Sequence, residues 1–157
     1  MNLLSDQQLV RKMRRCGIHY SKNMFVGVFA RDLLPTKLDY YPCTLIINTD
    51  TKNLPGKHWV AIYINGYKEG EYFDSFGHAP SEDIALWLNR FTLKWRRVNT
   101  STLQNPLSVN CGQFVLYFIH ERPLVNSSQS IMRQFGANTI HNNEIVNSYF
   151  DKHFKKC

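Results

Sequence analysis

The sequence predicts an α+β fold in one domain that spans residues 1–157. Three observations predict this class: a capped helix opens the chain, short β-rich runs occupy its centre, and an apolar helix follows them. Hydrophobic residues make up 43% of the chain and aromatic residues 13%, which is enough for a sizeable core. This composition excludes a disordered chain and a small domain that depends on disulfides.

The opening helix is predicted from its two ends. Ser5 stands at the N-cap position and Gln8 follows three places later, which is the spacing of a capping box. An apolar stripe that includes Leu9 and Met13 continues the helix up to Gly17, a residue typical of a helix end.

Three short runs predict strands in the centre of the chain. Residues 44–48 are mostly apolar and read as a buried strand, whereas residues 59–64 and 71–73 are rich in β-forming residues. The pair Asn65-Gly66 between the last two runs marks a turn, so we expect these two strands to form a hairpin.

Further elements follow the predicted hairpin. Residues 81–91 predict a helix with Ser81 as its N-cap, and residues 94–98 predict another strand. Residues 112–119 are apolar almost all round, which indicates a buried helix that Pro123 would end. Residues 143–154 predict an amphipathic closing helix with basic residues in its last turns.

The chain is basic, with 19 Lys and Arg residues against 12 Asp and Glu residues and a formal charge of +7. Such a charge favours contact with nucleic acid, an anionic membrane or an acidic partner, and solvated helix faces are the alternative for any one cluster. The residues that we assign to nucleic-acid binding are Arg11, Lys12, Arg14, Arg15, Lys94, Arg96, Arg97, Lys152, Lys155 and Lys156.

No stretch approaches the roughly 20 apolar residues that cross a bilayer, so we expect no contact with membranes. The cysteines at positions 16, 43, 111 and 157 are scattered and form no CxxC pair, which predicts an intracellular, mostly reduced protein. Cys16 and His19 have the spacing of half a zinc motif, but no matching half follows, so we expect no metal.

Cys111 is the candidate nucleophile. It follows a run of turn and cap residues and directly precedes the predicted buried helix. Unpaired backbone N–H groups and the positive end of the helix dipole favour a thiolate at that position. Gly112 would let a substrate backbone approach closely. The alternative is a buried cysteine that merely begins a helix.

A thiolate nucleophile needs a base, and His58 is the best placed of the histidines. It follows a loop that contains Pro55 and Gly56 and begins a predicted strand, which can aim its side chain. His120 is excluded because it lies nine residues beyond Cys111 on the same helix, roughly 13 Å away. A surface histidine is the alternative interpretation of His58.

Asp74 and Gln104 complete a catalytic scheme. Asp74 ends the second strand of the hairpin, so the open end of the hairpin would bring it near His58, where a carboxylate can orient the imidazole. It could instead cap the turn at Ser75. Gln104 lies seven residues before Cys111 and could fold back beside the sulfur, where its amide and the Cys111 N–H would stabilise an oxyanion.

The order and spacing of these residues resemble those of the adenovirus protease family (adenain) and, more distantly, of the SUMO-specific proteases. The resemblance runs from Leu4 to Phe150 and covers most of the chain. The motifs that carry it are His58-Trp59, Phe73-Asp74-Ser75-Phe76-Gly77 and Gln104-Asn105-Pro106 followed by Cys111-Gly112-Gln113-Phe114.

The resemblance implies a cysteine endopeptidase with a papain-like mechanism, on a central mixed sheet packed against helices. Cys111 would attack the scissile carbonyl, His58 would take and return the proton, and Asp74 would orient His58. Gln104 and the Cys111 N–H would hold the oxyanion, and Trp59 would line a narrow substrate channel near the scissile bond.

The resemblance also implies where and on what the enzyme acts. Its substrates would be capsid or core precursor proteins of a virus or a virus-like transposable element, cleaved at Gly-containing sites in the virion interior and the host nucleus. We expect a monomer with no metal or organic cofactor, activated by double-stranded DNA and a viral peptide. Because Leu93 stands where the adenain family has the cysteine that bonds this peptide, we expect no disulfide to it.

Two alternatives stay open. A protease that removes ubiquitin-like modifiers would use the same four residues, and the SUMO-specific proteases have Asp where adenain has Glu, as at Asp74 here. A basic DNA-packaging protein with a vestigial enzyme fold is the other alternative, and the complete set of four residues argues against it.

Overall fold

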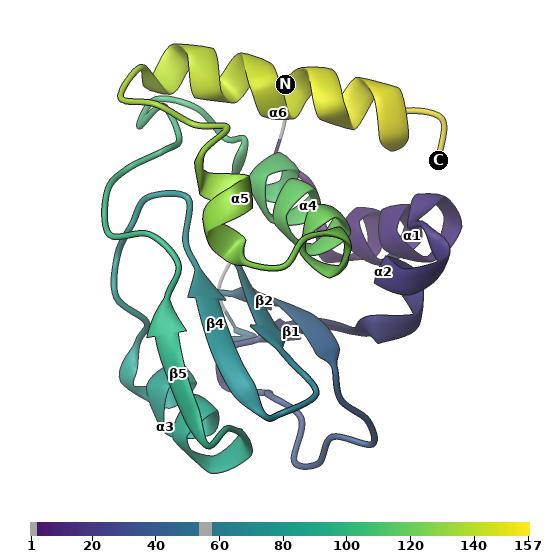
Figure 1. Cartoon of the computed structure of the whole chain (residues 1–157), viewed down its shortest axis with the longest axis vertical. Coiled ribbons are helices and arrows are strands. Elements are labelled where there is room, and N and C mark those ends of the chain that lie inside the picture. Colours follow the sequence, from purple (N-terminus) through teal and green to yellow (C-terminus); the bar gives the residue numbers. More distant parts are fainter. Residues whose placement is uncertain (1–2, 54–57) are drawn as a thin grey trace.

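The computed structural model describes residues 3–53 and 58–157. A five-stranded mixed sheet forms its centre, with the strands side by side in chain order (Figure 1). Strand β1 (Phe25–Ala30) pairs in parallel with β2 (Cys43–Asn48), and β4 (Glu69–Phe73) pairs in parallel with β5 (Lys94–Arg97). The central strand β3 (Trp59–Ile64) is antiparallel to both of its neighbours. The predicted α+β class is confirmed.

The predicted hairpin forms β3 and β4. The Asn65 side chain closes its turn, because Oδ1 accepts hydrogen bonds of 2.9 Å from the backbone N–H groups of Tyr67 and Glu69. Ala61 pairs with Phe73 near the other end of the hairpin. This register places the residues that precede β3 and follow β4 at one open end.

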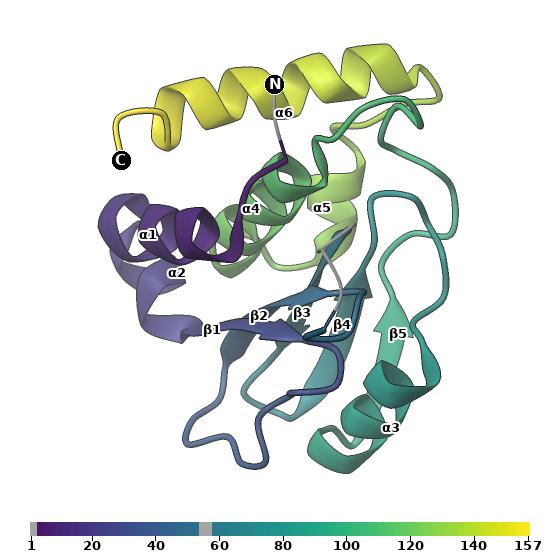
Figure 2. The same cartoon turned by 180° about the vertical axis from the view of Figure 1, so that it is seen from behind.

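Strands β2 and β3 are buried on both faces of the sheet, which explains their nearly continuous apolar runs. Alternate residues of β3 point to opposite faces and join two separate cores. One face packs against helix α4 (Cys111–Glu121) and the other against helix α3 (Glu82–Phe91) (Figure 2). The residues of β3 that face α4 are Trp59, Ala61 and Tyr63, and those that face α3 are Val60, Ile62 and Ile64.

Helix α4 is the buried helix that the sequence predicts. Its residues from Cys111 to His120 are all buried, between β3, α1 (Asp6–Cys16) and α6 (Thr139–His153). The short helix η1 (Arg122–Leu124) follows it directly and contains Pro123. The helix that carries the candidate nucleophile is therefore part of the core.

The helix ends agree only in part with the sequence. The capping box of α1 is present, because the Gln8 N–H donates to Ser5 Oγ and the Ser5 N–H donates to Gln8 Oε1. Ser81 stands at the N-cap of α3, but its side chain makes no capping hydrogen bond. Helix α6 begins earlier than predicted, because the Asn138 side chain accepts a hydrogen bond from the His141 N–H and caps it.

Four of the described elements were not predicted. They are β1, the short helices α2 (His19–Met24) and α5 (Ser128–Met132), and η1 after the buried helix. In β1 the register shifts between Phe25 and Gly27, so the apolar run lacks a regular alternation. The loop with Pro55 and Gly56, which we expected before His58, lies outside the described residues.

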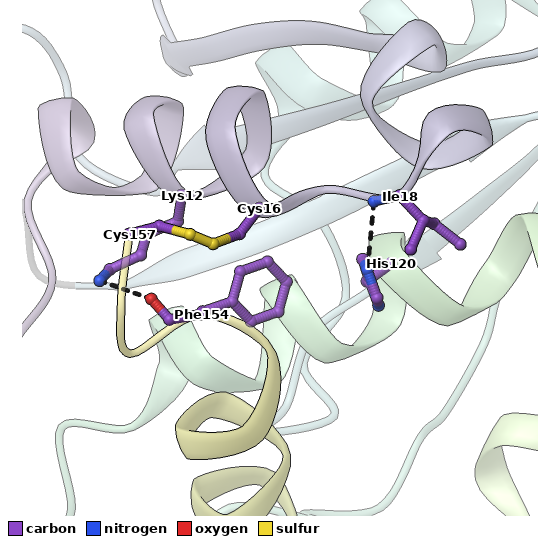
Figure 3. Close-up of a disulfide and its surroundings, with 6 residues drawn as sticks. All are labelled: Lys12, Cys16, Ile18, His120, Phe154 and Cys157. Atoms are coloured by element: carbon purple, nitrogen blue, oxygen red, sulfur yellow. Dashed lines mark hydrogen bonds between the residues drawn. A yellow bond between two sulfur atoms is a disulfide. The ribbon is translucent and has the colours of Figure 1, made fainter.

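The prediction of a mostly reduced chain is wrong for two of the four cysteines. Cys16 and Cys157 form a disulfide, with their Cα atoms 6.0 Å apart (Figure 3). They meet because the end of α6 returns to the last turn of α1, which the distance between them in the sequence does not reveal.

In the described part of the chain no group of three His, Cys, Asp or Glu residues could hold a metal ion. None of the helices described is long and apolar enough to span a membrane.

Candidate active site

The open end of the β3–β4 hairpin brings His58 and Asp74 together. Nε2 of His58 lies 2.6 Å from Oδ1 of Asp74, and the carboxylate is almost fully buried. The same oxygen accepts a hydrogen bond of 2.8 Å from the Phe76 N–H, so Asp74 both contacts His58 and caps the turn that follows. The Phe76 ring stacks on the imidazole, with ring centres 4.6 Å apart.

Cys111 is the first residue of α4, and its side chain is buried beside His58. Burial lowers the pKa of His58, but the hydrogen bonds and charges of Asp74 and Cys111 outweigh burial and raise that pKa to about 9. His58 is then protonated at neutral pH. Because Asp74 occupies Nε2, Nδ1 is the ring nitrogen left for the thiol. An imidazolium beside a cysteine is the setting in which the thiolate forms.

Gln104 is connected to this group through Ser75. The Ser75 hydroxyl donates a hydrogen bond of 2.6 Å to Gln104 Oε1, and Ser75 directly follows Asp74. Nε2 of Gln104 donates to the carbonyl oxygen and the hydroxyl of Ser108, both at 3.1 Å. For Gln104 to donate to an oxyanion, one of its N–H groups must turn from Ser108 toward the substrate.

The turn after Asp74 also receives the segment that leads to Gln104. The Asn99 side chain donates a hydrogen bond of 2.7 Å to the Asp74 carbonyl. Gly77 has a φ of +73°, and a Cβ atom there would lie 2.6 Å from the carbonyl oxygen of Ser101. A glycine is therefore required for the close approach of the two segments, which brings Gln104 toward Asp74.

Trp59 and Gly112 both contact the N-terminal segment. Nε1 of Trp59 donates a hydrogen bond of 2.8 Å to the Leu4 carbonyl. A Cβ atom on Gly112 would lie 3.0–3.3 Å from Leu4 side-chain atoms. Leu4 therefore fills the space beside Gly112 in the direction of a side chain, and the approach of a substrate backbone to Gly112 stays a prediction. Trp59 lines a cavity of about 600 Å³ together with Leu3, Leu4, Val28, Asn48 and other residues.

The structure separates the basic residues that the sequence assigned to nucleic acid. Lys12 is wrongly assigned: it is buried, and its ammonium donates a hydrogen bond of 2.8 Å to the Phe154 carbonyl at the end of α6 (Figure 3). The cluster on β5 is engaged with other groups. Lys94 pairs with Glu69 and Arg96 with Glu71, while the third member, Arg97, donates to a backbone carbonyl.

The remaining basic residues lie on α1 and at the end of α6. The Cys16–Cys157 disulfide joins the ends of these two segments, so clusters about 140 residues apart in the sequence become neighbours. We call this set the α1–α6 basic surface. All of its members are exposed: Arg11, Arg14, Arg15, Lys152, Lys155 and Lys156.

Ser75 and Leu4 are site residues that the sequence did not single out for a role. The position of Ser75 directly after Asp74 was the available signal, whereas nothing in the sequence indicates that Leu4 packs on Gly112. Together, the thiol, the imidazole and the carboxylate can perform nucleophilic attack on a carbonyl, with a proton carried to and from the leaving group.

The model of the Ulp1 protease family, C-terminal catalytic domain, matches residues 36–149. That segment contains His58, Asp74, Gln104 and Cys111.

Similar proteins occur in two groups of viruses. A cysteine protease of African swine fever virus is 28% identical over 95 residues, which are 52% of this chain and 35% of that protein. A protease of avian adenovirus 8 is 28% identical over 129 residues, which are 69% of this chain and 62% of that protein. The chain thus spans about a third of the length of the swine fever virus protein that it matches.

Solved structures show the same fold. The crystal structure of the African swine fever virus protease superposes with a TM-score of 0.63 at 22% identity, over 82% of this chain and 60% of that one. The central domain of an uncharacterised protein of Legionella pneumophila superposes with a TM-score of 0.51 at 14% identity, over 97% of both chains.

Proposed function

Because the chain belongs to the Ulp1 protease family, we propose that it is a cysteine endopeptidase of capsid maturation. It cleaves capsid or core precursor proteins of a virus or a virus-like element at Gly-containing sites. The observation that carries the proposal is the 2.6 Å contact of His58 Nε2 with Asp74 Oδ1, on an imidazole whose pKa Cys111 also raises. The similarity to an avian adenovirus protease over 69% of the chain supports a viral precursor as substrate.

In the proposed mechanism, the Cys111 sulfur attacks the scissile carbonyl carbon and forms a tetrahedral oxyanion. The Cys111 N–H and the Gln104 amide donate hydrogen bonds to this oxyanion. The imidazolium of His58 then protonates the leaving amine as the C–N bond breaks and a thioester forms. His58, now neutral, takes a proton from water as the water oxygen attacks the thioester carbon. The C–S bond then breaks and releases the acid and the Cys111 thiolate, which restores the thiolate beside the imidazolium. Asp74 holds His58 in orientation throughout.

The second candidate function is removal of ubiquitin-like modifiers. The match to the Ulp1 family favours it, and a swine fever virus relative that is 28% identical over 95 residues is named a SUMO-1 cysteine protease. The same four residues would perform the chemistry. The two functions differ in the substrate, which is a flexible precursor segment in one case and a folded modifier in the other.

The deciding experiment offers both substrates to the purified protein. One is the candidate capsid precursor from the source of this chain, and the other is a ubiquitin-like modifier precursor that ends in Gly-Gly. Cleavage of the first alone supports the proposed function, and cleavage of the second alone supports the deconjugase. The Cys111→Ala variant must cleave neither, and activity in that variant would contradict the mechanism.

We propose that double-stranded DNA activates the protease through the α1–α6 basic surface. Its arginines and lysines are exposed, whereas the β5 cluster is partly neutralised by Glu69 and Glu71. Enzyme–DNA affinity should then fall steeply as salt rises, because each phosphate contact releases counterions. Replacing Arg11, Arg14 and Arg15 by Gln should flatten this slope, whereas Lys94→Gln is the matched control. Equal affinity of both variants and the wild type would contradict the assignment.

The proposal includes a viral peptide as a second activator, which binds the enzyme without a disulfide. It also includes action as a monomer, in the virion interior and the host nucleus. Adding candidate peptides in the presence of a reductant would test the first point, because activation that needs no disulfide survives reduction.

A further inference from the structure

Three asparagines of α6 contact the loop that carries Gln104 and leads to Cys111. We define the catalytic loop as residues 103–110. Figure 1 shows the segment between β5 and α4 rising to the N-terminal half of α6. Asn142, Asn143 and Asn147 hold this loop at successive points, and none of the three belongs to the motifs that identified the site.

Two of these asparagines bond to the peptide groups on either side of Gln104. Asn142 Nδ2 donates a hydrogen bond of 3.1 Å to the Leu103 carbonyl, which belongs to the peptide group before Gln104. Asn143 Oδ1 accepts a hydrogen bond of 3.0 Å from the Asn105 N–H, which belongs to the peptide group after it. The Gln104 N–H itself donates to the Ser75 carbonyl at 3.0 Å. The backbone orientation of Gln104 is therefore held from both sides.

The third asparagine acts at the start of the nucleophile helix. Asn147 Oδ1 accepts a hydrogen bond of 2.6 Å from the side chain of Asn110, the N-cap residue of α4. Asn110 directly precedes Cys111, whose N–H is the other proposed oxyanion donor. Asn143 and Asn147 are four residues apart and therefore lie on one side of α6.

The hydrogen bonds of Asn142 show that its contact with the catalytic loop is specific. Its side chain is fully buried and uses both of its polar atoms: Nδ2 donates to the carbonyls of Leu103 and Gly136, and Oδ1 accepts from the Gly136 N–H. A buried amide with all of these partners fixes α6 and the loop in one relative position, because losing any partner leaves a buried polar group unpaired.

We propose that Asn142, Asn143 and Asn147 are positioning residues of the protease, which hold the catalytic loop so that Gln104 and the Cys111 N–H can meet the oxyanion. The proposal rests on the proposed function of Cys111 and Gln104. It assigns α6 a part in catalysis although none of its side chains contacts the reacting atoms. The loop must hold its place while the Gln104 amide turns from Ser108 toward the substrate.

The test compares variants that keep or remove the required hydrogen-bonding atom. Asn143→Asp keeps an acceptor for the Asn105 N–H, whereas Asn143→Leu has a similar size and no acceptor. At Asn142 the Asp variant is the disruptive one, because Asn142→Asp removes the Nδ2 donor that two backbone carbonyls need. The exposed neighbour Ser148→Ala is the matched control on the same helix.

Two reactions of Cys111 are measured for each variant. Hydrolysis of a peptidyl-Gly-Gly aminomethylcoumarin passes through an oxyanion, whereas alkylation of Cys111 by iodoacetamide does not. Asn143→Leu should lower kcat about 10- to 100-fold with little change in KM or in the alkylation rate. Asn143→Asp should retain most of the wild-type kcat, and Asn142→Asp should lose activity.

The possible outcomes separate this proposal from the proposed function. No hydrolysis by the wild-type protein contradicts the proposed function. Wild-type hydrolysis with an unimpaired Asn143→Leu, or with Asn143→Asp as impaired as Asn143→Leu, contradicts only the positioning role. A fall in the Cys111 alkylation rate equal to the fall in kcat also contradicts the positioning role, because the variant has then disturbed the nucleophile itself. If Asn143→Leu does not fold, Asn147→Leu and Asn147→Asp provide the same comparison at Asn110.

Discussion

Nε2 of His58 lies 2.6 Å from Oδ1 of Asp74, at the open end of a hairpin whose turn is 65–68. The two side chains are 16 residues apart in the sequence and mostly buried. This contact turns one ring nitrogen toward the carboxylate and leaves the other for Cys111, and it raises the pKa of the imidazole.

The first prediction concerns Asp74→Asn. Burial lowers the pKa of His58 and the contacts with Asp74 and Cys111 raise it to about 9, so removing the carboxylate charge should lower this pKa. The protonated imidazolium is lost at high pH, and the alkaline limb of the pH–rate profile should therefore move from about 9 toward neutral pH. We expect a fall in kcat/KM of at least about 100-fold. An unchanged alkaline limb in the variant would contradict the role of Asp74.

The second prediction is selective alkylation. Burial raises the pKa of Cys43 to about 12, which keeps its thiol protonated and unreactive, and Cys16 and Cys157 are paired. Iodoacetamide at neutral pH without reductant should therefore modify Cys111 first, as mass mapping of peptides would show. The Cys111→Ala variant should take up almost no label. Labelling of Cys43 as fast as Cys111 would contradict the prediction.

The third prediction concerns the Cys16–Cys157 disulfide. It closes a loop across 141 positions of the chain, so the chain-entropy model predicts a contribution of about 4–5 kcal/mol to the free energy of unfolding. Cys16→Ser and Cys157→Ser should each lower Tm by the same amount, and the double variant should be no worse than either.

The disulfide joins the last residue of α1 to Cys157, whereas Cys111 begins α4, so both single variants should retain kcat when measured well below their Tm. A wild-type Tm that does not change on reduction would contradict the stabilising role of the disulfide.

The fourth prediction is a loss of stability in acid through His120. This buried side chain accepts a hydrogen bond of 3.4 Å from the Ile18 N–H at Nε2 (Figure 3), and Nδ1 contacts the Tyr149 hydroxyl. Burial and the neighbouring His153 lower the pKa of His120 to about 4, against a weaker opposing effect of Glu121.

Between pH 6.5 and 4 the unfolded chain therefore binds a proton at His120 that the folded chain does not. The free energy of unfolding should fall as pH falls through this range, by about 3 kcal/mol in total from this group. Urea unfolding at pH 7 and pH 4.5 measures the change. His120→Gln should show a smaller decrease, and a decrease equal to that of the wild type would contradict the assignment.

Local patterns were sufficient for much of the fold and for the candidate catalytic residues. The capping box at Ser5, the turn at Asn65-Gly66 and the apolar run after Cys111 each depend on residues close together in the chain, and each forms as predicted. The hairpin then brings His58 and Asp74 together, because an antiparallel pair with a short turn has only one open end.

The unpredicted elements lack such local signals. Strand β1 has a shifted register at Gly27, and the short helices α2 and α5 hold too few residues for a periodic pattern. Lys12 looks like its basic neighbours in the sequence, but it turns inward because the Phe154 carbonyl at the end of α6 accepts its hydrogen bond.

The order and spacing of four residue types along the chain were enough to indicate the protease family, although each residue taken alone had a structural alternative. The tertiary structure alone decided which distant segments support them. Three sets of contacts join parts of the chain that are 37 to 141 positions apart: Leu4 over Gly112, Cys16 with Cys157, and the α6 asparagines on the catalytic loop. Such contacts depend on how complete elements pack, and packing is a property of the whole core that no local pattern encodes.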